Sequence, residues 1–449
     1  MRATGSDPAF PDWDTIRQER ARALAATLDL AALHHPLTRR KLAEAGLTRA
    51  DLHGPDDLAR LPLTTKAELA ATPGDARLDL TDAAVPDEAR TVWDIMYTTG
   101  SSGGPLPFVS TTSDFWDILL LQRRMLEIRG VTPADRIANL FPLTRQPHGA
   151  WIRVLHAAAS MQVPVVSAMP GNSGAPVGQD IDGVLDTLLR TAPTILWGVP
   201  SYVRRVLAAL AARGASLPSL RLLFVTGEGL SEEGRDELSA RLAAIGAPEA
   251  RISGSYGMTE MQGGLVECAA GSGFHNPLPE ALLFDVVDPT THQPLPEGEE
   301  GLLVLSHLRR RGTLLLRFAV GDTAVLSRAP CPHCGRVTER ILGTPRRADD
   351  LVKIKGMLVS PARASAAVEG VGAVRDWRFE LVKAADGPLA MDALRLLVAP
   401  EPGAPPDLPA QIAERVRAVI GVTPEVRLVT EADLAGGTWK VKRFVDLRG

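Results

Sequence analysis

The chain has 449 residues, a length that suggests two or three domains of roughly 150 residues each. Because 45% of the residues are hydrophobic and only 4% are aromatic, aliphatic side chains are expected to fill most of the cores. Its 49 Lys and Arg and 53 Asp and Glu give a net charge of -4, which argues against a dedicated nucleic-acid-binding protein. No apolar stretch approaches the roughly 20 residues of a membrane helix. Residues 1–13 lack the features of a secretory signal, and three cysteines cannot form a disulfide framework. We therefore expect a globular, cytoplasmic enzyme without a nucleic-acid or membrane partner.

The first 75 residues predict helices joined by polar turns. Apolar residues recur at helical spacing over 15–30, and shorter helical pieces are expected at 42–47 and 55–61.

From about residue 91 the pattern changes to strands that alternate with helices. Apolar runs at 194–197 and 222–225 predict buried strands. One amphipathic helix is expected over 114–129, and another begins after Ser231, a favourable N-cap, and ends near Gly246. Alternating strands and helices are typical of an α/β fold built in layers.

A third pattern begins near Pro277. Short strands are expected at 283–287, 301–308 and 313–318, and a basic turn is expected at 345–350. About 100 residues with alternating strand and helix signals follow this turn.

We place a domain boundary at the basic turn. The expected division is a large domain over 1–345, with a helical segment at 1–75, and a small α+β domain over 346–449.

The first motif with chemical meaning is a loop rich in glycine and hydroxyl side chains. Such a loop can surround phosphate oxygens with backbone N–H groups and hydroxyls, although a flexible hairpin turn has a similar composition. It lacks the Gly-Lys-Ser/Thr of a Walker loop. The candidate phosphate-binding residues are Thr98, Thr99, Gly100, Ser101, Ser102 and Gly103.

Two further motifs carry groups suited to a nucleotide. In 254–260, Tyr256 can stack on a base, and Glu260 is a carboxylate of the kind that magnesium prefers. In 317–322, Asp322 follows a glycine at a strand end and can accept the two ribose hydroxyls. Each motif alone is also compatible with an ordinary strand end or turn.

In this order and spacing the motifs resemble the adenylate-forming superfamily of acyl-CoA synthetases, luciferases and peptide-synthetase adenylation domains. The likeness covers nearly the whole chain and is greatest to phenylacetate-CoA ligases, because 57–66 is similar to their N-terminal signature. Pro200-Ser201-Tyr202, Gly227-Glu228 and Asp349-Asp350 also match. The resemblance implies a large N-terminal domain of layered α/β sheets and a small, mobile C-terminal domain.

The resemblance further implies a two-step reaction. A carboxylate attacks the α-phosphate of ATP to give an acyl-adenylate and pyrophosphate, and a thiol, usually that of coenzyme A, then displaces AMP. Positioning and electrostatic stabilisation carry most of such catalysis. By likeness, Thr98–Gly103 hold the β- and γ-phosphates, Thr259 contacts the α-phosphate, Glu260 holds magnesium, and Asp349 is the hinge. The remaining implied nucleotide-site residues are Gly227, Glu228, Tyr256, Gly257, Met258, Asp322 and Arg347.

The C-terminal segment 438–446 is similar to the family's Gly-Lys-x-x-Arg segment. Lys440 matches the lysine that bridges the carboxylate and the α-phosphate. Two departures weaken the match: Gly104 replaces a lysine of the phosphate loop, and Trp439 replaces the glycine before Lys440, which leaves Lys442 as a second candidate.

A possible structural zinc site comes from the Cys-x-x-Cys spacing of Cys331 and Cys334, which lets two thiolates reach one ion. Cys268 and His275 would complete a set of three cysteines and one histidine. His333 is the rival fourth ligand, and reduced thiols without metal are the alternative.

The acyl pocket is expected within 141–172. Candidates for its lining are His148, Gly149 and Trp151, with Gln146 and Met169 nearby, and the bulky tryptophan would suit a flat aromatic acid. We expect CoA as acceptor; a carrier-protein thiol, an amine, or a catalytically silent nucleotide-binding homologue are the alternatives. The oligomeric state is undetermined, and a dimer is compatible with the sequence.

Overall fold

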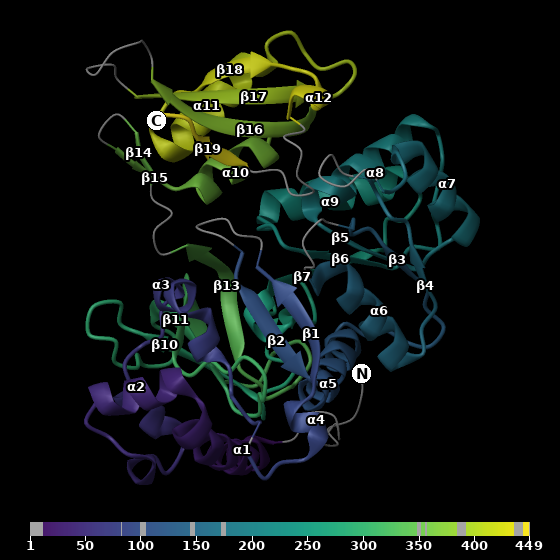
Figure 1. The fold of residues 1–449 in the computed structure, drawn as a ribbon. Coiled ribbons are helices and arrows are strands. Elements are labelled where there is room, and N and C mark those ends of the chain that lie inside the picture. Colours follow the sequence, from purple (N-terminus) through teal and green to yellow (C-terminus); the bar gives the residue numbers. More distant parts are fainter. Residues whose placement is uncertain are drawn as a thin grey trace. The chain divides into compact units, whose positions relative to one another are not determined.

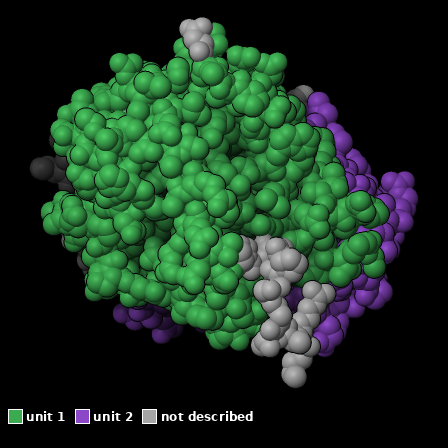
Figure 2. All heavy atoms as spheres, turned by 90° about the horizontal axis from the view of Figure 1, so that it is seen from below, with its two compact units in different colours: residues 1–134, 146–164, 253–348 green, residues 135–145, 165–252, 349–449 purple. Residues whose placement is uncertain are grey.

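The computed structural model describes residues 12–81, 83–98, 105–143, 149–171, 177–347, 352–354, 357–383, 392–434 and 443–448. The chain forms two compact units, coloured separately in Figure 2. Unit 1 comprises residues 1–134, 146–164 and 253–348, and unit 2 comprises 135–145, 165–252 and 349–449. The last change of unit lies close to the boundary expected at residue 345, and the division into 1–345 and 346–449 stays a prediction.

Unit 1 begins with the helical segment that the sequence predicts. Asp12 caps the first helix, because its carboxylate accepts a hydrogen bond from the Thr15 N–H at 2.8 Å. Leu24 and Leu28 of this helix are buried in an aliphatic cluster. The elements are α1 (Trp13–His34), α2 (Pro36–Glu44), η1 (Arg49–Asp51), η2 (Pro55–Arg60), α3 (Lys66–Ala71), η3 (Pro73–Ala76) and α4 (Asp87–Arg90).

A two-stranded antiparallel ribbon follows, formed by β1 (Val92–Tyr97) and β2 (Pro107–Thr111). Helix α5 (Thr112–Ile128) begins directly after it with a capping box between Thr111 and Asp114, close to the helix expected over 114–129. Helix α6 (Gly149–Met161) packs against α5.

The main sheet of unit 1 is antiparallel, with neighbours in the order β10-β11-β12-β13-β9-β8-β7. Antiparallel pairing lets consecutive strands follow one another without a crossover helix. The strands are β7 (Arg251–Met258), β8 (Gly263–Glu267), β9 (Phe274–His275), β10 (Leu282–Val287), β11 (Glu300–His307), β12 (Phe318–Ser327) and β13 (Arg340–Arg347). Figure 1 labels β7, β10, β11 and β13.

Two local expectations were wrong. Residues 313–317 were expected to form a strand, but they precede β12 and make only an isolated bridge, from Thr313 to Arg77. Their leucines are buried, and a buried apolar run has the same sequence pattern as a buried strand. The turn expected at 345–350 is wrong for Arg346 and Arg347, which belong to β13 and pair with Thr323 and Asp322; residues 348–350 lie outside the described residues.

Unit 2 contains a parallel sheet in the order β6-β5-β3-β4. Both expected buried strands are present, as β5 and β6, and the Ser231 hydroxyl caps α9 by accepting a hydrogen bond from Gly234 N–H at 3.0 Å. The strands are β3 (Ile137–Asn139), β4 (Val165–Ser167), β5 (Ile195–Gly198) and β6 (Leu222–Thr226), and the helices are α7 (Ile181–Thr191), α8 (Pro200–Ala212) and α9 (Glu232–Ala244).

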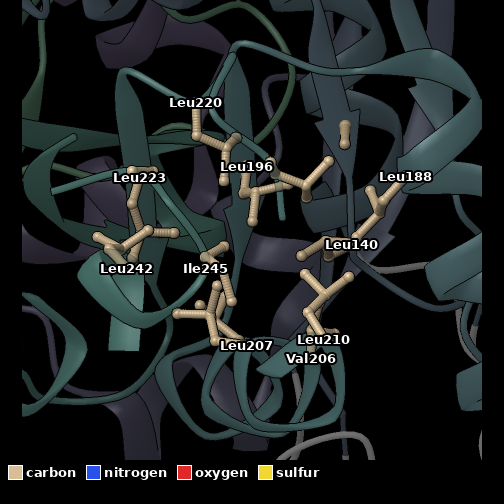
Figure 3. Packing of buried hydrophobic residues seen from close by; sticks show 14 of the residues in the cluster. Leu140, Leu188, Leu196, Val206, Leu207, Leu210, Leu220, Leu223, Leu242 and Ile245 are labelled. Carbon is tan, nitrogen blue, oxygen red and sulfur yellow. The ribbon is translucent and has the colours of Figure 1, made fainter. Parts of the chain in front are cut away.

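The core of this part of unit 2 is almost entirely aliphatic (Figure 3). Leu196 and Leu223 from the sheet are fully buried together with Leu207, Leu210 and Ile245. Burial of such a side chain contributes about 1.5–3 kcal/mol.

The C-terminal segment of unit 2 has a sheet of its own, in the order β18-β17-β16-β19, with α10 and α11 near it in Figure 1. Glu369 at the end of α10 accepts hydrogen bonds from Ser231 and from Arg204, the latter at 3.2 Å. The elements are β14 (Val352–Ile354), β15 (Met357–Val359), α10 (Pro361–Glu369), β16 (Val374–Lys383), β17 (Asp392–Pro400), α11 (Leu408–Ile420), β18 (Glu425–Leu428), α12 (Glu431–Leu434) and β19 (Phe444–Asp446).

Layered sheets and helices confirm the expected α/β fold class. Among the residues described, no helix combines the length and apolar character needed to cross a membrane.

Candidate functional site

A tight turn after β7 presents the last two residues of the second motif. Thr259 and Glu260 open the 3-10 helix η4 (Thr259–Met261), which ends at Gln262 in a left-handed conformation with φ of 58°. The β7–β8 hairpin positions this turn, because Tyr256 pairs with Leu265 across it. The side chain of Glu260 is thereby buried, with 6% exposure.

The third motif meets the second in unit 1. The Tyr256 hydroxyl donates a hydrogen bond to one carboxylate oxygen of Asp322, and the Arg347 Nε lies 3.2 Å from the other. Strand pairing brings Arg347 to Asp322, since the two residues are opposite each other on β13 and β12. Burial of the phenol, with the charge of Asp322 beside it, raises the pKa of Tyr256, so the hydroxyl stays protonated and donates.

Glu260 lies in the same electrostatic environment. Burial raises the pKa of its carboxyl, while the charges of Lys66 and Arg347 act in the opposite direction. A buried carboxylate whose charge is disfavoured by burial gains from a bound cation. The group therefore fits the magnesium role that the resemblance implies.

Lys66 is a site residue that the sequence motifs did not single out beyond its place in the 57–66 signature. A Cβ built on Gly321 would lie 3.6 Å from the Arg347 Nη1 and 3.9 Å from the Lys66 Nζ, so both cations flank the residue before Asp322. Lys66 begins α3, where Thr65 forms the capping box. The sequence held one signal for such a residue: Gly104 replaces a lysine of the phosphate loop, so another part of the chain has to supply that positive charge.

The phosphate loop can be located only at its start. Thr98 follows β1, and its N–H donates to the Leu106 carbonyl at 3.0 Å while its hydroxyl accepts from the Leu106 N–H at 3.0 Å. Residues 99–104 lie outside the described residues, as do the expected hinge Asp349, Lys440 and Lys442.

Gly227 and Glu228 follow β6 and belong to unit 2, whereas Tyr256 and Asp322 belong to unit 1. Gly227 has φ of 87°, which favours glycine. Glu228 accepts hydrogen bonds from the Ser201 N–H at 3.0 Å and hydroxyl at 2.7 Å. Its carboxylate thus satisfies the N-terminus of α8, which explains locally why the two matched motifs at 200–202 and 227–228 come together.

The acyl-pocket candidates are described only in part. Gly149 and Trp151 open α6 and are half-buried, whereas Gln146 and His148 lie outside the described residues. A Cβ on Gly149 would come within 3.9 Å of the Gln262 side chain. The start of α6 therefore lies beside the turn that carries Thr259 and Glu260.

The four predicted zinc ligands come together. Their ligand atoms lie within 4.8 Å of one another; the Cys268 and Cys331 sulfurs are 3.8 Å apart, and the Cys334 sulfur lies 3.7 Å from the His275 Nε2. Ligands on a tetrahedral zinc are separated by about 3.4–3.8 Å. His333 is exposed and is not part of the cluster.

The surroundings of the cluster also suit a metal. The Thr338 hydroxyl lies 3.3 Å from the His275 Nδ1, the kind of outer contact that orients a ligating histidine. The hydrogen bond between Cys268 and Cys334 lowers the pKa of the Cys334 thiol and raises that of Cys268, so Cys334 gives up its proton first. Gly335, with φ of 74°, closes the knuckle.

Known proteins share this fold and sequence pattern. A phenylacetate-coenzyme A ligase of Thermus thermophilus is 27% identical, over 98% of this chain and 99% of its own length. A phenylacetate-coenzyme A ligase of Escherichia coli is 26% identical, over 78% of this chain and 75% of its own. A 2-hydroxyisobutyryl-CoA ligase crystallised in the postadenylation state has the same fold, with a TM-score of 0.79 and 20% identity over 100% of this chain and 94% of that one.

The model of the AMP-binding enzyme family matches residues 19–308, more than half of the chain. This match shows that the chain belongs to the AMP-binding enzyme family, and the cluster of Tyr256, Glu260 and Asp322 agrees with it.

Proposed function

We propose that this protein activates a carboxylic acid with ATP and transfers the acyl group to coenzyme A. The observation that carries the proposal is the cluster of Tyr256, Glu260 and Asp322 with the cations Lys66 and Arg347, assembled from distant parts of unit 1. The phenylacetate-CoA ligases similar to the chain over 75–99% of their own length support the same reaction.

In the first step an oxygen of the acid attacks the α-phosphorus of ATP and pyrophosphate leaves. Asp322 binds the ribose: a carboxylate has about four acceptor positions, of which Tyr256 and Arg347 use two. The Tyr256 ring stacks on adenine, with Gly257 and Met258 beside it, and the resemblance adds Gly227 and Glu228 as nucleotide-site residues. Thr259 contacts the α-phosphate.

Charge on the phosphates is balanced by several groups. Glu260 holds magnesium, which neutralises phosphate charge when bound. Thr98 to Gly103 surround the β- and γ-phosphates, and Lys66 supplies the charge that Gly104 lacks. Lys440 bridges the acid and the α-phosphate.

In the second step the CoA sulfur attacks the acyl carbon and AMP leaves. We propose that residues 346–449 form a small domain that turns about Asp349 between the steps, so that Lys440 withdraws after adenylation. The acid is proposed to be aromatic, with Gly149, Trp151 and His148 lining its pocket.

Zinc is proposed as a structural ion bound by Cys268, His275, Cys331 and Cys334. Cys268 follows β8, and the Cys331–Cys334 knuckle lies between β12 and β13. The ion would join these two loops to β9, which carries His275, and its proposed role is structural.

A pyrophosphate-release screen tests the proposal. Aryl, arylacetic, amino-aryl and short aliphatic acids are supplied with ATP and magnesium, with and without CoA. We expect release with an aromatic acid and a thioester product only with CoA, and carrier-protein thiols or amines serve as rival acceptors. Binding of ATP without turnover of any acid would contradict the proposal and indicate a silent nucleotide-binding protein.

Lys440→Ala tests the assignment of the bridging lysine, with Lys442→Ala as the matched control. We expect acid-dependent pyrophosphate exchange to be lost in the first variant and kept in the second. The reverse result would move the role to Lys442.

A further inference from the structure

The turn that carries Thr259 and Glu260 is held from behind by side chains that the reaction itself does not use. The Thr259 carbonyl accepts hydrogen bonds from the Gln262 N–H at 3.1 Å and from the Gln262 side-chain amide at 2.8 Å. The Gln262 carbonyl accepts one from the Gln122 amide at 2.9 Å. In the sequence, the Glu260 carbonyl lies between these two carbonyls, and its hydrogen-bond partner comes from β11.

That contact is the imidazole of His307, the last residue of β11. Its Nε2 lies 3.0 Å from the Glu260 carbonyl oxygen. The opposite ring nitrogen, Nδ1, accepts a hydrogen bond from the Leu315 N–H at 3.2 Å, and the His307 N–H donates to the Leu315 carbonyl at 2.8 Å. The ring is therefore anchored on one side to the segment before β12 and on the other to the turn.

These contacts fix the tautomer of the ring. The Glu260 carbonyl can only accept a hydrogen bond, so Nε2 carries the proton and donates it, and Nδ1 accepts from the Leu315 N–H. His307 has 0% exposure, and the hydrogen bonds at its two ring nitrogens hold the ring in this orientation.

From this geometry we propose that His307 is a positioning residue for magnesium-ATP: it fixes the main chain of Glu260 so that the carboxylate is directed at the metal. The inference rests on the proposed function. A buried carbonyl without its donor would gain by rotating toward another partner, and in a three-residue 3-10 helix such a rotation moves the side chain of the same residue.

The test compares His307→Leu, which removes both ring nitrogens, with His307→Gln, whose amide can still donate to the Glu260 carbonyl. Loss of a group that orients a metal ligand costs roughly 10- to 100-fold in metal affinity or activity. We expect His307→Leu to raise the magnesium concentration for half-maximal pyrophosphate exchange by this factor, with the KM for the acid unchanged, and His307→Gln to need less magnesium than His307→Leu.

His35 provides matched controls, because it is also a buried histidine in unit 1, with 1% exposure, but it caps α2 through Thr38. His35→Leu and His35→Gln should lose thermal stability without a change in magnesium dependence. Magnesium-dependent ATP binding by calorimetry gives a second readout that needs no turnover.

Unchanged magnesium dependence in a folded His307→Leu protein would overturn the proposal, as would an equal change in His35→Leu. If His307→Leu does not fold, the comparison of His307→Gln with His35→Gln decides. Failure of the proposed function would give a different result: the wild-type protein would show no pyrophosphate exchange with any acid tested. Calorimetry of magnesium-dependent ATP binding would still test the role of His307.

Discussion

The contact between Tyr256 and Asp322 permits a prediction that separates two roles of one side chain. Tyr256→Phe keeps the aromatic ring and removes only the hydroxyl that donates to Asp322. If the ring acts by stacking on adenine, nucleotide affinity should survive this change. Asp322→Asn, by contrast, replaces one acceptor oxygen by an N–H donor where the ribose hydroxyls must donate.

The magnitudes follow from the hydrogen bonds involved. A hydrogen bond to a charged group contributes about 1.5–3 kcal/mol, and about 1.4 kcal/mol corresponds to a factor of ten. Asp322→Asn should therefore weaken ATP binding by roughly 10- to 150-fold. Tyr256→Phe should lower the free energy of unfolding by about 1.5–3 kcal/mol but leave ATP affinity near that of the wild type. The ion pair of Asp322 with Arg347 adds little to the free energy of unfolding, since the Arg347 side chain is 45% exposed.

The assay is calorimetric titration with ATP, alongside the thermal unfolding midpoint of each variant. Tyr256→Ala is the companion variant, because it removes the ring as well and should lose affinity. Equal loss of ATP affinity in Tyr256→Phe and Asp322→Asn would refute the reasoning, since the hydroxyl and not the ring would then carry the contribution of Tyr256.

Three further predictions concern the metal and phosphate groups. Cys331→Ser should purify with well below one zinc per chain and a lower unfolding midpoint, whereas His333→Ala should keep its zinc; equal zinc content would contradict the assigned ligands. Because burial raises the pKa of Glu260, the unfolded chain holds fewer protons than the native one between the two pKa values, so the magnesium-free protein loses stability as pH rises through that window. Glu260→Gln should show a smaller fall in unfolding midpoint over this range, and an unchanged fall would disprove the link. Lys66→Met should raise the KM for ATP roughly 10- to 100-fold, while Lys383→Met, at an exposed site, should not; similar KM values would remove Lys66 from the nucleotide site.

Local patterns predicted the helices and buried strands well where one physical cause dominated. Ser231 caps α9 as expected, and the apolar runs before Gly198 and Gly227 are central strands. The strand predicted at 313–317 was wrong, because an apolar run indicates that a segment is buried but not which groups its backbone N–H and C=O will bond. There the Leu314 N–H donates to the Ala76 carbonyl, a contact that no local rule anticipates.

The chemistry-bearing residue types and their order were determined by the sequence alone: a hydroxyl-rich loop, the Tyr256–Glu260 turn, Asp322, and three cysteines with one histidine. Their residue identities define what each can bind. Only the tertiary structure decided which of them meet. Strand pairing brings Arg347 to Asp322, a separate helix brings Lys66 to the same place, and β11 places His307 behind Glu260. These contacts join residues from 25 to nearly 260 positions apart in the sequence numbering, and such long-range pairing depends on packing that no short stretch of sequence encodes.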